Sequence, residues 1–233
     1  MRKRTIWSNV IIFSMLLGLV ALAIPLDTLV ASAKTEGVYY NGDTTKPNVS
    51  LMINVYWGDE YIEPILHALE VGGAKATFFV GGSWASKNGE LLNKIISAGH
   101  EIGNHGYLHK DHDKISNERQ YQEIKTCHDM VKGISGVEMT LFAPPSGAYN
   151  RDTVRIADEL GYKTIMWTLD TIDWRDKSAD LVYKRATKKL NNGNLILMHP
   201  TAHTLQALPG IIATYKNAGF DLVSVSENIM SSI

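Results

Sequence analysis

The first buried strand of this chain is predicted by the stretch Val49-Ser50-Leu51-Met52-Ile53-Asn54-Val55-Tyr56. The stretch is mostly apolar and contains several β-branched residues, as is typical of a strand that is covered on both faces. Residues 60–69 follow with apolar side chains at helical spacing, so the strand leads into a helix that can pack against it. The stretch therefore predicts the first strand-helix unit of an α/β protein.

The same alternation continues along the rest of the chain. Each helical pattern has about 10 to 15 residues, which is typical of parallel strands joined by crossover helices. An open doubly wound sheet and a (β/α) barrel both satisfy this order, and periodicity alone does not choose between them. Further strands are predicted near Glu101 and over residues 76–80, 139–143, 163–169, 195–199 and 220–225, with helices over residues 84–98, 117–132, 151–160, 179–190 and 205–218.

Polar or special residues stand at or just after the ends of the predicted strands. In a parallel barrel, functional groups collect at the C-terminal ends of the strands. No glycine-rich phosphate loop follows the first strand, which disfavours nucleotide binding. The residues at strand ends are Asn54, His105, Pro144, Asp173 and His199.

His105 and His109 lie four residues apart in the polar run that begins at Gly99. Neutral imidazole is the commonest metal ligand among side chains, and two rings on one turn can reach a single ion. The alternative is that two histidines simply lie near each other on a solvated loop. If the protein binds a metal, we expect it here.

The first 33 residues have the layout of a secretory signal peptide. Basic side chains at residues 2–4 precede an apolar run over residues 10–24, and Ala31-Ser32-Ala33 forms a cleavage site of the A-x-A type. An uncleaved anchor is the alternative, but the run is shorter than the roughly 20 residues that span a bilayer. We expect a secreted or envelope-associated protein without a stable membrane span, divided into a signal peptide (1–33), a linker (34–47) and one domain (48–233).

The charge and cysteine content exclude some functions. Residues 1–33 contain three of the 23 basic residues and one of the 24 acidic residues, so residues 34–233 keep 20 basic (23 minus 3) and 23 acidic (24 minus 1) and are mildly acidic. Nucleic-acid binding would require a basic face, and we expect no such partner. Cys127 is the only cysteine, so no internal disulfide can form.

Five short motifs follow one another from residue 75 to residue 199. They are Lys75-Ala76-Thr77-Phe78-Phe79-Val80, Gly99-His100-Glu101-Ile102-Gly103-Asn104-His105-Gly106-Tyr107-Leu108-His109, Phe142-Ala143-Pro144-Pro145-Ser146-Gly147, Asp170-Thr171-Ile172-Asp173-Trp174 and Leu197-Met198-His199. In this order they resemble the polysaccharide deacetylase family, also called the NodB homology domain. Residues 54–61 together with residues 142–147 also resemble a divergent subgroup found in spore-forming Gram-positive bacteria.

The resemblance implies a fold, a cofactor and a partner. The fold is a distorted (β/α) barrel with about seven parallel strands. The cofactor is a divalent metal, usually zinc, and His105 and His109 match its two histidine ligands. The partner is an acetylated cell-wall glycan, such as peptidoglycan or a chitin-like chain, and the implied reaction is hydrolysis of its N-acetyl groups.

The first motif of the family departs from its usual pattern in this chain. The family has two adjacent aspartates, a general base followed by a metal ligand, and here these positions are Asn54 and Val55. A carboxamide cannot take a proton from water as a carboxylate does, and valine cannot bind a metal. Two imidazoles alone are fewer than the three protein ligands usual for catalytic zinc. The carboxylates near enough in sequence to replace the missing ligand are Asp59, Glu60 and Asp111.

A second departure accompanies the first. The family carries an arginine that pairs with the base aspartate, and here that position is Ala143. Losing one partner of a buried ion pair costs roughly 3 to 5 kcal/mol, whereas losing both can be neutral. Asn54 and Ala143 are therefore a coherent pair of changes. The usual aromatic residue of the same motif is replaced by Ser146, which lowers one wall of the groove.

The other half of the implied site matches the family. Asp173 matches the residue that orients the acid histidine, and His199 matches the histidine that protonates the leaving amine. Trp174 and Leu197 match the apolar pocket for the acetyl methyl group. The remaining residues that the resemblance implies for substrate binding are Pro144, Pro145 and Tyr149.

These residues leave two main hypotheses. One is a metal-dependent deacetylase with an altered first motif, based on His105, His109, Asp173 and His199. The other is a catalytically silent protein that binds glycan at the cell envelope, based on the changes at the base, ligand and arginine positions. An interaction module that binds no glycan is a third alternative.

Overall fold

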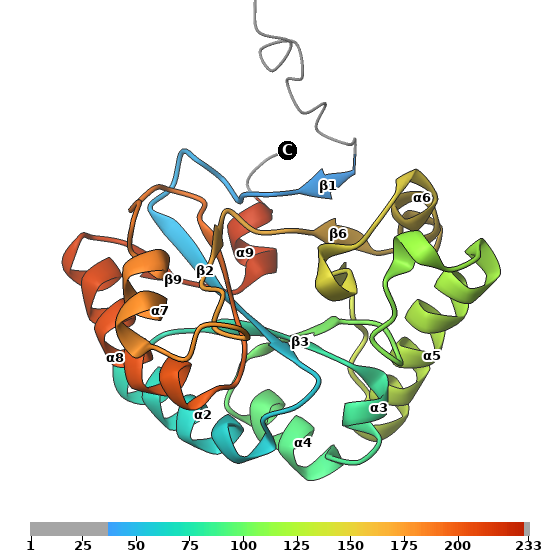
Figure 1. Ribbon diagram of the computed structural model, residues 1–233, viewed down its shortest axis with the longest axis horizontal. Coiled ribbons are helices and arrows are strands. Elements are labelled where there is room, and N and C mark those ends of the chain that lie inside the picture. Colours follow the sequence, from blue (N-terminus) through green and yellow to red (C-terminus); the bar gives the residue numbers. More distant parts are fainter. Residues whose placement is uncertain (1–36, 231–233) are drawn as a thin grey trace, which may run out of the picture. The chain divides into compact units, whose positions relative to one another are not determined.

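The computed structural model describes residues 37–230, which form a parallel sheet flanked by helices (Figure 1). Its strands are β1 (Val38–Tyr39), β2 (Asn48–Val55), β3 (Ala76–Val80), β4 (Glu101–Asn104), β5 (Leu141–Phe142), β6 (Lys163–Ile165), β7 (Leu169–Asp170), β8 (Leu195–Met198) and β9 (Asp221–Leu222). Its helices are α2 (Asp59–Gly72), α3 (Gly82–Ala85), α4 (Gly89–Ser97), α5 (Asn117–Ser135), α6 (Arg151–Glu159), α7 (Ala179–Ala186), α8 (Ala202–Asn217) and α9 (Val225–Ile229), with short 3-10 turns at His112–Lys114 and Pro145–Gly147.

The strands follow the order β1-β6-β5-β4-β3-β2-β8-β7, and every recorded pair is parallel. β9 pairs with the beginning of β2, away from this path. Within the described residues the path ends at β1 on one side and at β7 on the other, so the sheet is not closed into a complete barrel. A parallel barrel that is left open in this way is distorted, and the prediction of a distorted (β/α) barrel is confirmed.

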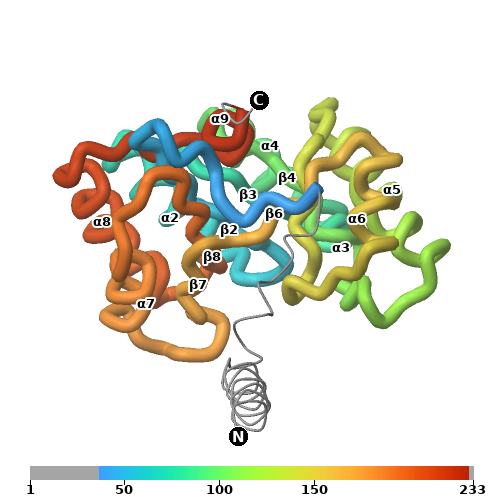
Figure 2. Tube along the Cα trace, turned by 90° about the horizontal axis from the view of Figure 1, so that it is seen from above, coloured from blue at the N-terminus to red at the C-terminus, as the bar shows by residue number. Residues whose placement is uncertain are grey.

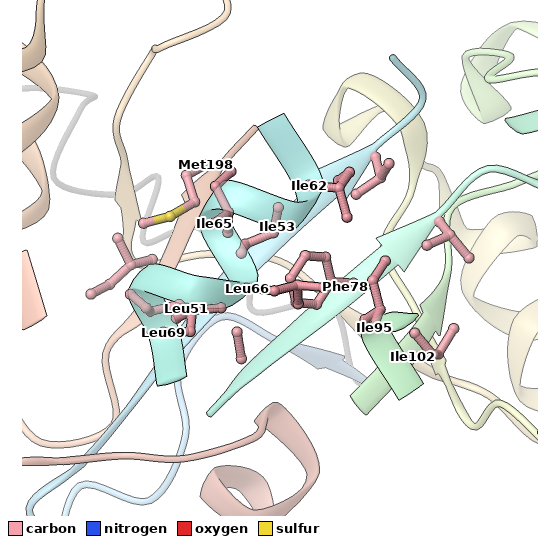
Figure 3. Close-up of a cluster of buried hydrophobic side chains, with 14 of the residues drawn as sticks. Leu51, Ile53, Ile62, Ile65, Leu66, Leu69, Phe78, Ile95, Ile102 and Met198 are labelled. Carbon is pink, nitrogen blue, oxygen red and sulfur yellow. The ribbon is translucent and has the colours of Figure 1, made fainter. Parts of the chain in front are cut away.

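β2 lies near the middle of the sheet and separates two groups of buried side chains. Its residues alternate between the two faces, as the pleat of a strand requires. Leu51, Ile53 and Val55 are fully buried in the larger cluster, which lies between the sheet and the outer helices (Figure 3). Burying a Leu, Ile or Val side chain contributes about 1.5 to 3 kcal/mol before conformational entropy is subtracted, so this layer stabilises the sheet strongly.

The second cluster lies on the other face of the sheet. Met52 of β2 packs there with side chains of neighbouring strands, and α9 contributes Val225 and Ile229. Asn54 comes two residues after Met52 and therefore projects from the same face of β2. The pleat of β2 thus directs Asn54 inward and Val55 outward.

Side-chain caps fix where several helices begin. Ser116, Asn150, Ser178 and Thr201 each precede a helix, and each side-chain oxygen accepts a backbone N–H three residues later. Such caps stabilise a helix by about 1 kcal/mol each. The cap at Thr201 begins α8 two residues after His199, so it also limits the path of the chain beside that histidine.

One strand was missed and three predicted elements are divided or shortened, while the predicted helix 179–190 ends earlier, at Ala186. β1 and its partner β6 lie side by side in Figure 2, and β1 falls inside the range predicted as a linker, where two residues give no periodic signal. The predicted strand 163–169 is divided into β6 and β7, and the predicted helix 84–98 is divided into α3 and α4. The predicted strand 220–225 is reduced to β9, because the Ser224 cap starts α9 at Val225.

The predicted signal peptide, residues 1–33, lies outside the described residues. In the part of the chain that the structure describes, no helix has both the length and the apolar character needed to cross a membrane.

Candidate functional site

A cavity of about 440 Å³ lies where the carboxyl ends of the central strands meet. It collects residues from the ends of β2, β4, β7 and β8 and from the loops that follow them, as expected for a parallel barrel. Its lining residues are Asn54, Tyr56, Trp57, His105, His109, Ser146, Gly147, Trp167, Asp170, Trp174, Leu197 and His199.

The two histidines predicted as metal ligands lie beside each other in the cavity. Their ring centroids are 5.0 Å apart with an interplanar angle of 73°. His105 Nδ1 donates a hydrogen bond of 2.7 Å to the carbonyl oxygen of Ala143, so in the neutral ring Nε2 carries the free lone pair. Burial, and then the neighbouring His109, holds the pKa of His105 well below its ordinary value of 6.5. Burial also lowers the pKa of His109.

Two buried side chains accept hydrogen bonds from the backbone of the loop that carries both imidazoles. Asn104 Oδ1 accepts the N–H of Gly106 at 2.9 Å. Glu123 Oε2 accepts the N–H of Leu108 at 2.6 Å, and its other oxygen forms a 2.7 Å ion pair with Arg119. These bonds fix a loop whose backbone is left-handed at Gly106 and again three residues later. The histidine pair is therefore preorganised.

The third ligand that a zinc site would need is missing. Val55, at the position of the family's carboxylate, is fully buried in the cluster outside the sheet. Asp59 accepts a hydrogen bond from an indole N–H, Glu60 is exposed, and Asp111 pairs with Lys114 at 2.7 Å. In the described part of the chain, no group of three His, Cys, Asp or Glu side chains could hold a metal ion. These residues do not fit a catalytic zinc centre.

Asn54, at the position of the general base, lies in the wall of the cavity and is only 5% exposed. Its side-chain oxygen is buried and has no hydrogen-bond partner among residues 37–230. An amide at this place can donate and accept hydrogen bonds, but it cannot remove a proton from water. Ala143, at the arginine position, is buried in the inner cluster.

Asp173 and His199 are brought together as predicted. Asp173 Oδ1 accepts a 2.7 Å hydrogen bond from His199 Nδ1, and Oδ2 accepts the backbone N–H of His199 at 2.6 Å. The hydroxyl of Thr204 also donates to Oδ2, and the His203 ring donates to the Asp173 carbonyl oxygen. Burial acts to raise the pKa of Asp173, but the hydrogen bond from His199 and its other partners hold it below the ordinary 3.8. This carboxylate therefore stays ionised and orients the imidazole.

Besides the predicted Trp174, the cavity lining contains three aromatic side chains that the sequence reasoning missed, Tyr56, Trp57 and Trp167. The indole of Trp57 stacks on the His199 ring with centroids 5.9 Å apart and an interplanar angle of 7°. Trp57 and Trp174 are 44% and 56% exposed, and Trp167 and Tyr56 complete the aromatic lining. Exposed aromatic faces are suited to stacking on sugar rings, and the position of Trp57 just after a strand end was the available signal.

The predicted substrate-binding residues are only partly gathered in the cavity. Trp174 and Leu197 line it, whereas Pro144, Pro145 and Tyr149 lie outside its lining. Both prolines are buried, and Pro145 begins the 3-10 turn while Pro144 precedes it. The hydroxyl of Tyr149 forms a hydrogen bond with that of Tyr40, next to β1, so this tyrosine ties the first strand to the rest of the fold.

As it stands, the site can hold and polarise a ligand on the Asp173–His199 side. It offers neutral imidazoles and an amide on the other side, where a hydrolase would need a base. This arrangement suits recognition of a neutral polar ligand better than activation of water.

Comparisons with known proteins show which proteins this chain is similar to. The model of the polysaccharide deacetylase family matches residues 41–165. The uncharacterized protein YlxY of Bacillus subtilis is 40% identical over 188 residues, which cover 81% of this chain and 59% of YlxY. The peptidoglycan-N-acetylglucosamine deacetylase PgdA of Listeria monocytogenes is 32% identical over 164 residues, covering 70% of this chain and 34% of PgdA. The chain thus spans only part of the length of these two relatives.

Among solved structures, BA3943 of Bacillus anthracis, described as a CE4 family pseudoenzyme, is similar to this chain with a TM-score of 0.80 and 36% identity, covering 82% of this chain and 68% of BA3943. A mutant of BA3943, described as a pseudoenzyme with restored enzymatic activity, has a TM-score of 0.80 and 34% identity. Residues 41–165, which the family model matches, include the first three of the five motifs. This protein belongs to the polysaccharide deacetylase family.

Proposed function

We propose that this protein binds acetylated cell-wall glycan at the cell envelope and does not hydrolyse it at enzymatic rates. The observation that carries this proposal is the composition of the cavity. Asn54 stands where a base is needed, and the histidine pair has no carboxylate beside it. The proposal places the protein outside the cytoplasmic membrane, in keeping with its resemblance to peptidoglycan deacetylases.

The cavity lacks a group that can remove a proton from the attacking water. Hydrolysis of an acetamide requires a nucleophilic oxygen that loses a proton as it attacks the carbonyl carbon. Asn54 has no basic lone pair for that proton, and its amide can only hold a water in place. His199, oriented by Asp173, could still deliver a proton to a leaving nitrogen, but that step follows the attack and cannot replace it.

Glycan binding uses the groups that remain. The cavity joins exposed indole faces to hydrogen-bonding groups at its wall, which is the combination that sugar rings require. Leu197 lies among the same residues and offers an apolar contact for an acetyl methyl group. A cell-wall glycan with acetylated amino sugars is the ligand that these features favour.

A second candidate is a slow metal-dependent deacetylase, favoured by the intact geometry of Asp173 and His199 and by the preorganised histidine pair. It differs from the first candidate in one measurable property. A working deacetylase must hold its divalent metal tightly, whereas the proposed binding protein needs none.

Zinc binding to the purified protein tests the proposal. We expect calorimetry to give weak or no binding, with little difference between the native chain and His105→Ala, and acetate release from acetylated chitin oligomers and peptidoglycan at background. Tight stoichiometric zinc binding that is lost in His105→Ala, together with turnover of about 1 per second or more, would replace the proposal by the deacetylase.

A further inference from the structure

The loop between β7 and α7, residues 171–178, carries two neighbouring residues in opposite surroundings. Asp173 is buried and accepts hydrogen bonds from the residues that follow β8. Trp174, the next residue, is 56% exposed and lines the cavity. Because little of the protein packs around an indole as exposed as this one, its position depends on the backbone of the loop that carries it.

The backbone of this loop contains an unfavourable conformation. Ile172 has a φ of 52°, in the left-handed region that a β-branched residue rarely adopts. One oxygen of Asp170 accepts the N–H of Ile172 at 2.8 Å. The carbonyl oxygen of Ile172 accepts the N–H groups of Arg175 and Asp176 at 3.2 and 3.0 Å. A strained residue of this kind persists only where the surrounding contacts hold it, so the two ends of the loop have to be fixed.

Arg185 of α7 connects the two ends of the loop. Its Nη1 donates a 2.9 Å hydrogen bond to the carbonyl oxygen of Thr171, and its Nη2 forms an ion pair with Oδ2 of Asp176. A guanidinium can bind both acceptors at once because its donors are arranged in a rigid fork. The side chains of Arg185 and Asp176 are only 22% and 25% exposed, so solvent screens this pair less than the ion pairs on the outer helix faces.

Asp176 also links this bridge to the exposed indole. Arg175 Nε and Nη2 donate to the two carboxylate oxygens of Asp176 at 2.9 and 3.1 Å. Hydrogen bonds from Arg175 and Arg185 hold the pKa of Asp176 below its ordinary value of 3.8, so the carboxylate stays charged. The Arg175 guanidinium lies 5.8 Å from the centroid of the Trp174 ring, within the range of a cation–π contact. A chain of contacts therefore runs from α7 to the indole.

Asp173 does not depend on this chain. Its carboxylate and its carbonyl oxygen accept hydrogen bonds from His199, His203 and Thr204, which lie after β8 and in α8. These bonds would remain if Arg185 were replaced. The bridge therefore acts on the exposed end of the loop and not on its buried end.

We propose that Arg185 is a positioning residue for glycan binding, and that together with Asp176 it holds the loop so that the indole of Trp174 faces the cavity. This inference rests on the proposed function, in which exposed indoles stack on sugar rings, and adds a residue that controls one of them. Neither Arg185 nor its acceptors Thr171 and Asp176 line the cavity, so any effect of Arg185 on binding passes through the loop.

A double-mutant cycle followed by calorimetry with the tetramer of N-acetylglucosamine tests the inference. The variants are Arg185→Met, Trp174→Ala and the two combined. We expect each single substitution to lower the affinity by about 3- to 10-fold, the range of one aromatic stacking contact. The double variant should bind like Trp174→Ala alone, because Arg185 acts through this indole. Lys184→Met, at the exposed neighbouring position of α7, is the matched control and should bind like the native protein.

The outcomes separate the two proposals. Losses that add up in the double variant overturn the role of Arg185, because they show that it affects binding by another route. Affinity equal to that of the native protein in either Arg185→Met or Trp174→Ala also overturns it and leaves glycan binding intact. No binding of the tetramer, or of peptidoglycan fragments, by the native protein overturns the proposed function itself. Thermal unfolding verifies the fold of each variant, and Asp176→Asn, which keeps the shape of the side chain, takes the place of Arg185→Met in the cycle if that variant does not fold.

Discussion

The two sides of the cavity differ in how firmly their polar groups are bound. On the β7–β8 side, Asp173 accepts hydrogen bonds from the His199 ring, the His199 backbone and the Thr204 hydroxyl. On the β2–β5 side, the Asn54 oxygen has no donor among the described residues, and Ala143 contributes only its backbone carbonyl to His105. Removing a group from the first side leaves several others unpaired, whereas changes on the second side can compensate each other. The side with Asp173 and His199 is thus tied into the structure by hydrogen bonds, whereas the side with Asn54 and Ala143 can tolerate substitutions.

The largest expected effect comes from restoring the family's residues on the β2–β5 side of the cavity. The variant Asn54→Asp, Val55→Asp, Ala143→Arg restores the residues that the family carries at the base, metal-ligand and arginine positions. We expect zinc affinity to rise by roughly 100-fold or more, together with acetate release from acetylated oligomers. Zinc calorimetry and an acetate assay measure the two gains.

Val55→Asp alone is the control for that experiment. It places a carboxylate at a fully buried position and should lower the melting temperature without restoring activity. If the triple variant gains neither metal affinity nor activity, the assignment of Asn54 and Val55 to the two aspartate positions is wrong.

Asp173→Ala should disrupt the hydrogen bonds on the β7–β8 side of the cavity. It removes the acceptor of three donors, and we expect a loss of about 3 to 5 kcal/mol, which lowers the melting temperature by roughly 6 to 20 °C. Asp170→Ala, which removes the acceptor of one recorded N–H, is the matched control and should cost less. Calorimetric melting of both variants and of Asn54→Leu decides the comparison. A melting temperature for Asp173→Ala equal to that of Asn54→Leu would contradict it.

The pH dependence of stability should reveal His112, which is packed behind the histidine loop. It is fully buried against the Phe142 ring, and burial lowers its pKa from 6.5 to about 4. The unfolded chain therefore takes up this proton at a higher pH than the folded chain. Stability should fall as the pH drops from 6.5 to 4, by roughly 3 kcal/mol from this group.

Urea unfolding between pH 4.5 and 7.5 measures that slope. His112→Leu should reduce this slope without abolishing it, because burial also lowers the pKa values of His100, His105 and His109, which remain in the variant. His67→Leu, at an exposed position of α2, should leave it unchanged. A slope that is the same in His112→Leu and in the native protein would show that other groups control acid stability.

The smallest expected effect concerns Trp57, whose indole stacks on His199. Trp57→Ala removes an indole that is 44% exposed in the cavity wall beside His199, and a ring-stacking contact of this kind with a sugar is worth about 0.5 to 1.5 kcal/mol. We expect a loss of about 3- to 10-fold in glycan affinity, measured by calorimetry with the tetramer of N-acetylglucosamine. Tyr121→Ala, at an exposed aromatic residue of α5, should bind like the native protein. An unchanged affinity in Trp57→Ala would remove this indole from the binding surface.

Much of the fold follows from local patterns in the sequence. Alternating apolar strands and amphipathic helices require parallel pairing, and parallel pairing gathers the strand ends at one edge. His105, His109, Leu197 and His199 are for this reason found together in one cavity. The short strand β1 was missed because two residues carry no period, and its pairing with β6 depends on residues far along the chain.

The sequence by itself determined the family, the order of elements and the absence of a base and a carboxylate ligand at the first motif, because these depend on residue identity. Only the tertiary structure decided which polar groups are satisfied. The unpaired oxygen of Asn54 and the stacking of Trp57 on His199 depend on distances between side chains of different strands and loops. The same holds for Tyr149, whose hydroxyl is bound to Tyr40 outside the cavity lining. Hydrogen bonds and ring contacts act over only a few ångströms, and spacing along a chain does not fix such distances.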